Sequence, residues 1–281
     1  MNTLELLNFG SCELKKKEIT THRLDSEILL SNVLKKKREQ ILVKLNQIMK
    51  KKDISTFYKL IKRRAAKEPV AYIIKKKEFW SKNFKVNENT LIPRPETELL
   101  VQNLIKSYKD KKISILDVGT GSGCILISLV SELPFSKGIG IDISTQAIKV
   151  AKENASLHKV KNKVKFFNKS IINLYNLKFD LLVSNPPYIE RKNIKNLDDG
   201  IKNYEPLIAL NGGNDGLDVI KKVIYKSTKV LKLNGILALE IGNGQFRAVK
   251  NLLFTNNFKI KFVIKDYENN IRCIFSTLIK K

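Results

Sequence analysis

The sequence has few residues of the kinds that build disulfide scaffolds, metal centres or membrane spans. Its 281 residues include three cysteines, two histidines and one tryptophan. Cys12, Cys124 and Cys273 are scattered, odd in number and never paired as CxxC, so we expect a reduced, cytoplasmic protein without disulfides or structural zinc. No stretch approaches the roughly 20 apolar residues that a membrane span needs. We therefore expect neither a metal site nor a membrane-bound protein.

The beginning of the chain also lacks a targeting pattern. Residues 1–10 contain Glu5 and no basic segment, whereas a secretory signal peptide starts with positive charge. We expect no signal peptide here. With 281 residues, of which 43% are apolar, the chain is long enough for two domains with ordinary cores.

Acidic residues are scarce beside basic ones, 27 against 53, and the net charge is +26. Such a charge suits nucleic-acid binding. However, only eight of the basic residues are arginine, the residue best suited to bidentate contacts with bases and phosphates. The lysine-rich runs are spread over the N-terminal half and form no single stripe: 15–17, 35–37, 50–52, 75–77 and 109–112. We interpret the charge as compositional bias, and we expect from it only a weak, nonspecific attraction to RNA or ribosomes at low salt.

The first 75 residues show helical periodicity and contain one glycine, Gly10. Over residues 24–34 the apolar side chains keep one helical face: Leu24, Ile28, Leu29 and Val33. A further helix is expected from Asp53, a residue type suited to an N-cap, until the basic stretch before Pro69. The pattern predicts a small N-terminal helical domain over 1–75.

From about residue 113, apolar runs typical of strands alternate with helical segments. The expected strands cover 113–116, 138–141, 164–167, 179–183 and 235–241, and the helices between them 122–133, 144–157 and 214–231. This alternation predicts βαβ units and a mostly parallel sheet covered on both faces. Two period-2 segments, 258–264 and 271–278, add an antiparallel C-terminal hairpin. We therefore expect a seven-stranded, Rossmann-like α/β domain over 101–281, joined to the helices by a β-hairpin linker over 76–100.

A glycine-rich turn follows the first expected strand of this domain. It reads Asp117-Val118-Gly119-Thr120-Gly121-Ser122-Gly123. Glycines allow the backbone to turn tightly and to approach a ligand closely. Asp142 lies at the end of the next expected strand, where a carboxylate can accept hydrogen bonds from both hydroxyls of a ribose.

Two common nucleotide motifs do not fit this turn. A dinucleotide fold needs GxGxxG and a P-loop ends in GK[ST], and the turn has neither. D-x-G-x-G-x-G with an acid after the second strand is instead the pattern of class I methyltransferases, and it predicts S-adenosylmethionine as the cofactor. Asp117 would shape the loop and meet the methionine amino group, and Asp142 would hold the ribose. The loop itself would approach the methionine and ribose through Gly119, Thr120, Gly121, Ser122 and Gly123.

The motif Asn185-Pro186-Pro187-Tyr188 follows the fourth expected strand. In an open α/β sheet, ligands bind beyond the carboxyl ends of the strands, at the point where the strand order reverses. If the fourth strand lies beside the first, this motif faces the glycine-rich loop. A planar amide or amino nitrogen is a poor nucleophile that needs positioning and electrostatic help more than a strong base.

The residue types of the motif suit methyl transfer to such a nitrogen. The side-chain oxygen of Asn185 and the backbone carbonyl of Pro186 could each accept one N–H of an acceptor NH₂ group. The two prolines, Pro186 and Pro187, would fix the carbonyl direction, and Tyr188 would offer a flat face. The motif alone leaves open whether the nitrogen belongs to a glutamine, an adenine or a cytosine.

At this point the chain resembles the PrmC/HemK family, the protein-(glutamine-N5) methyltransferases that modify peptide chain release factors. Besides residues 116–123 and 184–189, the matching segments are 25–30 (DSEILL), 68–72 (EPVAY), 78–80 (EFW), 91–98 (LIPRPETE), 205–207 (EPL) and 209–210 (AL). The run Pro95-Glu96-Thr97-Glu98 favours the release-factor branch over the related ribosomal-protein glutamine methyltransferases. The resemblance implies that the substrate is the glutamine of the Gly-Gly-Gln loop and that the N-terminal domain grips the release factor.

The chain departs from the family pattern in a few places. Lys77 stands where arginine is usual, and Lys75 where glycine is common. Ser170 and Ile171 replace an Asp-Trp-like pair near the adenine, so the resemblance implies that Ile171 packs against the adenine. Arg94 could order the cofactor entrance or brace the linker against Glu96 or Glu98.

Other classes of function compete with this interpretation. DNA adenine-N6 and cytosine-N4 methyltransferases share N-P-P-[YFW] and suit the positive charge, but the chain has no evident base-reading insertion. A non-catalytic RNA- or ribosome-binding module would not need an intact Asn185 and glycine loop. We expect a monomer, because no coiled-coil pattern or large apolar stripe indicates more.

Overall fold

The computed structural model describes residues 1–175 and 177–280 and divides into two compact units. Unit 1 comprises Met1–Lys76 and Asp198–Tyr204. Unit 2 comprises Lys77–Leu197 and Glu205–Lys281. No helix in the described ranges is long and apolar enough to cross a membrane.

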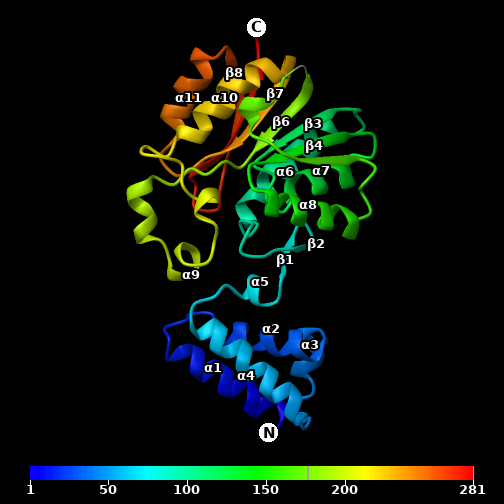
Figure 1. Cartoon of the computed structure of the whole chain (residues 1–281), viewed down its shortest axis with the longest axis vertical. Helices are drawn as coiled ribbons and strands as arrows, with labels where there is room; N and C mark the ends of the chain where they lie inside the picture. The colour runs from blue at the N-terminus through cyan, green and yellow to red at the C-terminus, as the bar shows by residue number, and fades with distance from the viewer. Residues whose placement is uncertain (176, 281) are drawn as a thin grey trace. The chain divides into compact units, whose positions relative to one another are not determined.

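Unit 1 is helical, as its sequence predicts (Figure 1). Its helices are α1 (Thr3–Lys15), α2 (His22–Leu34), α3 (Arg38–Leu42), α4 (Lys51–Ala65), α5 (Val70–Ile73) and the short α9 (Asp199–Lys202). Asn2 begins α1 with a capping box, in which its side chain accepts from the Glu5 N–H and the Glu5 carboxylate accepts from the Asn2 N–H, both at 2.9 Å. Gly10 allows α1 to lie close to α2 and α4, because a Cβ there would come within 2.7 Å of both Ser26 and Phe57.

Two details of these helices differ from the expectation. Asp53 is not an N-cap, since α4 begins two residues earlier and Asp53 lies in its first turn. Leu24 is 41% exposed, and the buried face of α2 includes Asp25 instead. Asp25 can be buried because Arg64 of α4 donates a hydrogen bond to its carboxylate at 2.7 Å.

Unit 2 is built on a seven-stranded sheet with the order β5-β4-β3-β6-β7-β9-β8. The strands are β3 (Ser114–Val118), β4 (Lys137–Asp142), β5 (Val164–Asn168), β6 (Phe179–Ser184), β7 (Leu231–Glu240), β8 (Phe258–Lys265) and β9 (Ile271–Leu278). The first five pair in parallel, whereas β9 is antiparallel to both β7 and β8. The predicted mostly parallel sheet with a C-terminal antiparallel hairpin is confirmed.

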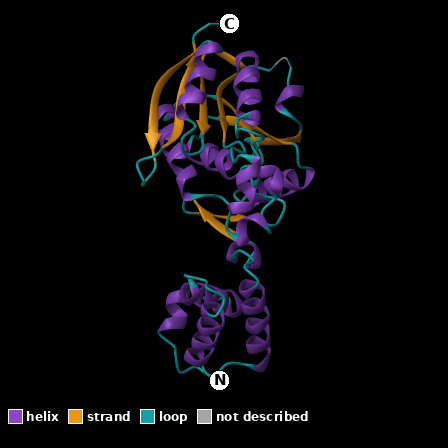
Figure 2. Ribbon diagram, turned by 90° about the vertical axis from the view of Figure 1, so that its left-hand side faces the viewer, coloured by secondary structure: helices purple, strands orange, loops and turns teal. Residues whose placement is uncertain are grey.

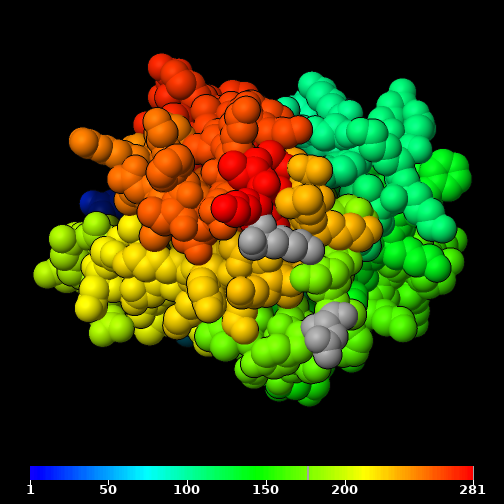
Figure 3. Space-filling view, turned by 90° about the horizontal axis from the view of Figure 1, so that it is seen from above, coloured from blue at the N-terminus to red at the C-terminus, as the bar shows by residue number. Residues whose placement is uncertain are grey.

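Helices cover both faces of the sheet, as parallel strands require (Figures 1 and 2). Those of one face are α6 (Pro95–Tyr108), α7 (Cys124–Glu132) and α8 (Thr145–Leu157), and those of the other are α10 (Asp218–Val230) and α11 (Phe246–Thr255). Alternate residues of each strand supply the two cores: Leu181 and Val183 of β6 belong to one, and Leu182 belongs to the other. In Figure 3, atoms of the C-terminal part of the chain (orange and red) fill one side of this end of unit 2, and teal and green atoms fill the other.

The remaining elements are short connections. β1 (Lys76–Phe79) and β2 (Lys82–Lys85) form the expected two-stranded hairpin. Three 3₁₀ helices follow β5 and β6: η1 (Ile171–Asn173), η2 (Arg191–Asn196) and η3 (Leu207–Ala209). Lys75, at a position where the family commonly has glycine, has a left-handed backbone with φ of 56°, a conformation that glycine adopts at lower cost.

Candidate active site

The glycine-rich turn and the Asn-Pro-Pro-Tyr motif follow neighbouring strands. β3 pairs with β6 in parallel, and the last paired residues are Val118 and Ser184. β4 lies on the other side of β3, so Asp142 ends at the same edge of the sheet. The sequence left open whether the first and fourth strands are neighbours. In the structure they are, and this brings the two motifs to the strand-order reversal where α/β sheets bind ligands.

The backbone of the glycine-rich loop is fixed by hydrogen bonds to the neighbouring strand β4. The N–H groups of Gly119 and Thr120 both donate to the Ile141 carbonyl, at 2.9 and 3.0 Å. Gly119 has φ of 71°, and a Cβ placed on it would meet no protein atom within 4 Å. A larger residue would therefore be strained there and would also project into space that the loop leaves free.

Asp117 lies beneath this loop and is fully buried. Its Oδ2 accepts a 2.6 Å hydrogen bond from the Thr120 hydroxyl, which ties the loop down. Its Oδ1 is buried without a hydrogen-bonding partner among the described residues. Burial raises the pKa of the Asp117 carboxyl to about 7. Asp117 thus shapes the loop, and its contact with a methionine amino group stays a prediction.

Asp142 presents a carboxylate at the end of β4. Its Oδ2 accepts from the Gly121 N–H and its Oδ1 from the Ser144 N–H, both at 2.9 Å. Burial raises the pKa of this carboxyl, and the backbone hydrogen bonds oppose that shift. Each oxygen keeps a lone pair, so the fixed carboxylate can still accept from two ligand hydroxyls.

A cavity of about 610 Å³ lies within unit 2 at this edge of the sheet, a volume typical of small-molecule sites. Six of the predicted site residues line it: Gly119, Gly121, Asp142, Ile171, Asn185 and Pro187. The other six do not: Asp117, Thr120, Ser122, Gly123, Pro186 and Tyr188. The cavity therefore joins predicted cofactor and acceptor residues in one space, and the second group lies outside its lining.

Further parts of the wall are apolar and come from segments that the motifs do not include. Leu91, Leu207 and Ile208 line the cavity, and the last two are more than half exposed. Ile171, at the start of η1, is buried and also lines it. The preceding Ser170 caps η1 with its hydroxyl, which accepts from the Ile172 N–H at 3.4 Å. Such a wall suits the flat, apolar faces of a base.

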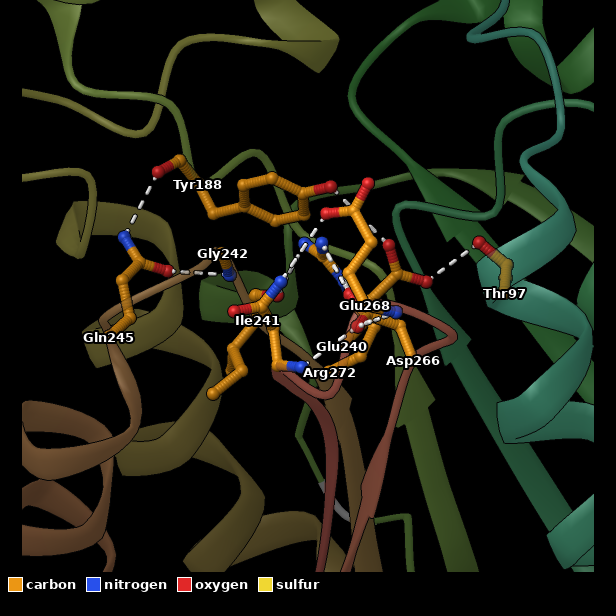
Figure 4. Close-up of polar contacts among 10 residues, drawn as sticks. Thr97, Tyr188, Glu240, Ile241, Gly242, Gln245, Asp266, Glu268 and Arg272 are labelled. Atoms are coloured by element: carbon orange, nitrogen blue, oxygen red, sulfur yellow. Dashed lines mark hydrogen bonds and ion pairs between the residues drawn. The ribbon is translucent and has the colours of Figure 1, made fainter.

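Asn185 is fixed from behind by side chains of other elements. Its Nδ2 donates to the Thr97 hydroxyl of α6 at 3.1 Å. That hydroxyl donates to Glu240 Oε2, at the end of β7, at 2.6 Å. Glu240 is 1% exposed, and burial raises its pKa to about 7. Figure 4 shows the Glu240 carboxylate between the side chains of Thr97 and Tyr188.

Tyr188 is held at both ends. Its hydroxyl donates to Glu240 Oε1 in a long, 3.4 Å contact, and burial raises the pKa of its phenol. Its backbone carbonyl accepts from the Gln245 side-chain amide at 3.0 Å, while the Gln245 oxygen accepts from the Gly242 N–H (Figure 4). The ring is therefore rigidly placed, and its predicted role as a platform for a planar acceptor stays a prediction.

Arg94 has a different partner from those considered in the sequence. Its guanidinium pairs with Glu205 at 2.5 Å, not with Glu96 or Glu98. Glu205 is buried and also accepts from the Ile92 N–H at 3.2 Å. Glu98 accepts instead from the Trp80 N–H of the hairpin at 2.9 Å. The pair joins two segments that each contribute to the cavity wall, Leu91 on one side and Pro206–Ala209 on the other.

The chain is similar to known proteins over most of its length. Residues 5–74 match the family model of the PrmC N-terminal domain, and residues 95–199 match that of the methyltransferase small domain. A release factor glutamine methyltransferase of Fusobacterium nucleatum is 38% identical over 277 residues, which cover 97% of this chain and 78% of that protein. The chain belongs to the release factor glutamine methyltransferase family.

Other comparisons agree on the fold. A methyltransferase structure from Pyrococcus furiosus covers 71% of this chain and is itself covered to 89%, with a TM-score of 0.53 at 16% identity. A bifunctional methyltransferase of Rickettsia felis is 36% identical over 299 residues, 96% of this chain. The chain spans only 57% of that protein's length, slightly more than half.

The residues present fit the cofactor of this family, S-adenosylmethionine. The open glycine backbone, the Asp142 carboxylate and the apolar wall with Ile171 lie on one cavity. The unpaired Oδ1 of Asp117 lies just beneath the loop. No group of three or more histidine, cysteine, aspartate or glutamate side chains suited to a metal ion occurs in ranges 1–175 and 177–280. Neither His22 nor His158 lines the cavity. His22 hydrogen-bonds with the Ser11 side chain, and His158 hydrogen-bonds with the Asn83 carbonyl.

Three residues of this methyltransferase fold were missed as members of the site: Thr97, Glu240 and Glu205. Thr97 and Glu205 occur in segments that carry the family resemblance, but nothing in their local sequence points to Asn185 or Arg94. Glu240 ends an apolar strand, where an acid resembles an ordinary surface residue. Its burial was the signal, and burial becomes visible only once the strands are assembled.

Proposed function

We propose that this chain transfers a methyl group from S-adenosylmethionine to the side-chain amide nitrogen, N5, of the glutamine in the Gly-Gly-Gln loop of bacterial peptide chain release factors. The observation that carries the proposal is that Asn185 lines the same cavity as Gly119, Gly121 and Asp142. An amide acceptor held by Asn185 would therefore lie beside a cofactor held by the glycine loop. Family membership supports the same reaction and substrate.

The protein residues act by binding and orientation in this reaction. The bound cofactor supplies an electrophilic methyl group on a sulfonium. Asp142 and the loop fix the cofactor, while Asn185 Oδ1 and the Pro186 carbonyl accept the two N–H groups of the glutamine amide. Both acceptors carry partial negative charge, so they stabilise the positive charge that develops on the nitrogen as it is methylated. The nitrogen then releases one proton, and no strong protein base is needed.

The finer features of the partner follow from the same proposal. Unit 1 would hold the body of the release factor while the Gly-Gly-Gln loop reaches the cavity. We expect a monomer that acts in the cytoplasm, where release factors work. The charge of +26 would add a weak, salt-sensitive attraction to RNA and ribosomes.

Mass spectrometry of the acceptor tests the proposal directly. A release factor incubated with the chain and the cofactor should gain one methyl group on the Gly-Gly-Gln glutamine. Asn185→Ala should lower kcat by about 10²–10³, the loss typical of removing one group that stabilises charge in a transition state. An isolated loop peptide should be methylated less efficiently than the intact factor, because it cannot contact unit 1.

Two controls keep the result specific. A release factor with the loop glutamine replaced by alanine should gain no methyl group. Duplex DNA and ribosomal proteins, offered with a radiolabelled cofactor, should remain unlabelled. Label in DNA with none in the release factor would contradict the proposal and favour an adenine or cytosine acceptor.

A further inference from the structure

A buried carboxylate stands two hydrogen bonds behind the acceptor-binding residue. Glu240 accepts from the Thr97 hydroxyl at 2.6 Å, and that hydroxyl accepts from Asn185 Nδ2 at 3.1 Å. Thr97 and Glu240 are 2% and 1% exposed, and neither lines the cavity. Thr97 therefore affects an acceptor through Asn185. Glu240 affects an acceptor through Thr97 and, by the longer contact, through the Tyr188 hydroxyl.

The direction of this chain of hydrogen bonds follows from its last member. An ionised carboxylate can only accept, and a threonine hydroxyl has one proton to donate. When Thr97 donates to Glu240, only its lone pairs remain for Asn185. Asn185 must then turn its NH₂ group toward Thr97 and its Oδ1 away from it. The alternative amide rotamer would place Oδ1 against a hydroxyl that has no proton left to give.

We propose that Thr97 and Glu240 are positioning residues that set the amide orientation of Asn185, so that its oxygen and not its NH₂ group faces the acceptor nitrogen. This inference rests on the proposed function, since it assumes that the acceptor is an NH₂ group. An NH₂ group of Asn185 aimed at another NH₂ group would offer a donor to a donor. An asparagine without a polarised partner has no means of excluding that arrangement, because its oxygen and nitrogen ends are nearly equal in size.

The charges around Glu240 decide when it can act as a pure acceptor. Arg272 of β9 favours its ionised form, whereas Glu96 of α6 opposes it, and the Tyr188 hydroxyl donates to Oε1. Cys273 is the strand neighbour of Glu240 in β9, and Arg272 is itself paired with Asp266 (Figure 4). Burial is the largest effect and raises the pKa of Glu240 to about 7. Below that pH the carboxyl gains a proton and can donate to Thr97. The two hydrogen bonds from Glu240 through Thr97 to Asn185 can then run in either direction.

The first experiment removes the hydroxyl at constant side-chain size. Thr97→Val should lower kcat for release-factor methylation by about 10- to 100-fold, less than the loss of Asn185 itself. Thr97→Ser keeps the hydroxyl and should stay within about threefold of the wild type. The dissociation constant for S-adenosylmethionine should change less than twofold in both variants, because Thr97 does not line the cavity. This pattern distinguishes positioning of Asn185 from general damage to the site.

The second experiment reverses the direction of these hydrogen bonds instead of removing one of them. In Glu240→Gln, the side-chain NH₂ can donate to Thr97, which can then donate to Asn185 Oδ1 and turn it away from the acceptor. The ratio of wild-type to Glu240→Gln kcat should be about tenfold or more at pH 8. It should fall toward one as the pH drops below about 6, since protonated Glu240 resembles glutamine. Adding Thr97→Val to Glu240→Gln should lower kcat little further, because both changes disrupt the same series of hydrogen bonds to Asn185.

The outcomes separate this inference from the proposed function. If the wild type methylates the glutamine but Thr97→Val keeps wild-type kcat, the positioning role is wrong and the function stands. Equal losses in Thr97→Val and Thr97→Ser, or a loss of cofactor binding in Thr97→Val, would also overturn it, because the hydroxyl would not be the determinant. A pH-independent ratio of wild type to Glu240→Gln would overturn it even if Thr97→Val failed to fold. A wild type that leaves the glutamine unmethylated would refute the proposed function itself.

Discussion

The two sides of the cavity are stabilised over different distances along the chain. The cofactor side, residues 117–123 with Asp142, is held by hydrogen bonds among its own members, such as Thr120 to Asp117 and Gly121 to Asp142. The acceptor side, residues 185–188, is held by Thr97 and Glu240 on α6 and β7. The contacts of the cofactor side lie within one βαβ unit, whereas those of the acceptor side form only when distant elements are assembled. A change on the cofactor side should therefore affect cofactor binding more than catalysis, and one behind the acceptor side should affect catalysis more than cofactor binding.

The largest effect on cofactor binding is expected at Asp142. Asp142→Ala removes the carboxylate that lines the cavity, and we expect the dissociation constant for S-adenosylmethionine to rise about 10- to 100-fold, the loss typical of hydrogen bonds to a charged group. Isothermal titration calorimetry measures this change. At saturating cofactor, kcat should stay within a few-fold of the wild type, because the residues behind Asn185 are untouched.

Asn185→Ala is the matched control on the other side of the cavity. It should lower kcat strongly while leaving the dissociation constant for the cofactor within about threefold. If both variants lost cofactor affinity and kcat to the same degree, the two sides would be energetically one unit and the comparison would fail.

This difference also explains what the sequence could and could not predict. The seven strands and the helices α7, α8 and α10 between them are visible because apolar period and turn residues are local signals. Helix α11, between β7 and β8, was not predicted. The glycine loop and Asp142 could be predicted for the same reason, as their partners lie within the same βαβ unit. The pairing of the first and fourth strands was only a condition of the argument from sequence, because strand order depends on contacts between distant segments.

The parts that could not be predicted depend on long-range burial. Thr97 reaches Asn185 across 88 residues and Glu240 across 143, and no periodicity links such positions. For Arg94 the sequence leaves two roles open, ordering the cofactor entrance or bracing the linker against Glu96 or Glu98. Its partner is Glu205, 111 residues away. Asp53 was assigned as a cap from its residue type, although α4 begins before it. The grouping of Asp198–Tyr204 with unit 1 depends on contacts such as that of the Tyr204 hydroxyl with the Ala66 carbonyl at 2.8 Å.

A smaller effect is expected at Arg94, whose pair with Glu205 joins two segments that both contribute to the cavity wall. Arg94→Ala leaves a buried carboxylate without its charged partner, and we expect it to lower the free energy of unfolding by about 2 kcal/mol, below the cost at fully buried pairs because Arg94 is 31% exposed. Chemical denaturation measures this loss. The dissociation constant for the cofactor should rise only a few-fold.

Arg94→Lys is the control, because it keeps the charge but loses the planar guanidinium. The free energy of unfolding of Arg94→Lys should lie between those of the wild type and Arg94→Ala. If Arg94→Ala were as stable as the wild type, the pair would not be what holds the two segments together.

Burying the Asp117 carboxylate beneath the cofactor loop costs free energy when the group is ionised. Its carboxyl has a pKa of about 7 in the folded chain, against about 3.9 in an unfolded one. The folded state therefore binds the proton more tightly, and the stability that this provides is complete below about pH 4 and is lost as the pH rises through about 7. Asp117→Asn cannot ionise, so at pH 8 we expect it to raise the free energy of unfolding without cofactor. The gain should be smaller than the roughly 4 kcal/mol that this pKa difference corresponds to, because the buried NH₂ group of the asparagine is itself costly to bury without a partner.

The pH dependence of that gain distinguishes ionisation from a simple change in packing. Denaturation of both proteins at pH 5 and pH 8 should show a larger advantage of Asp117→Asn at pH 8, and the titration of Glu240 cancels because it occurs in both. A gain that is equal at the two pH values would mean that the Asp117 charge carries no cost in the fold. A gain confined to high pH would mean that the cofactor side, though local in sequence, retains a buried charge that destabilises the free protein. Saturating S-adenosylmethionine should then narrow the difference, because a bound ammonium group would favour the ionised Asp117 and not the amide.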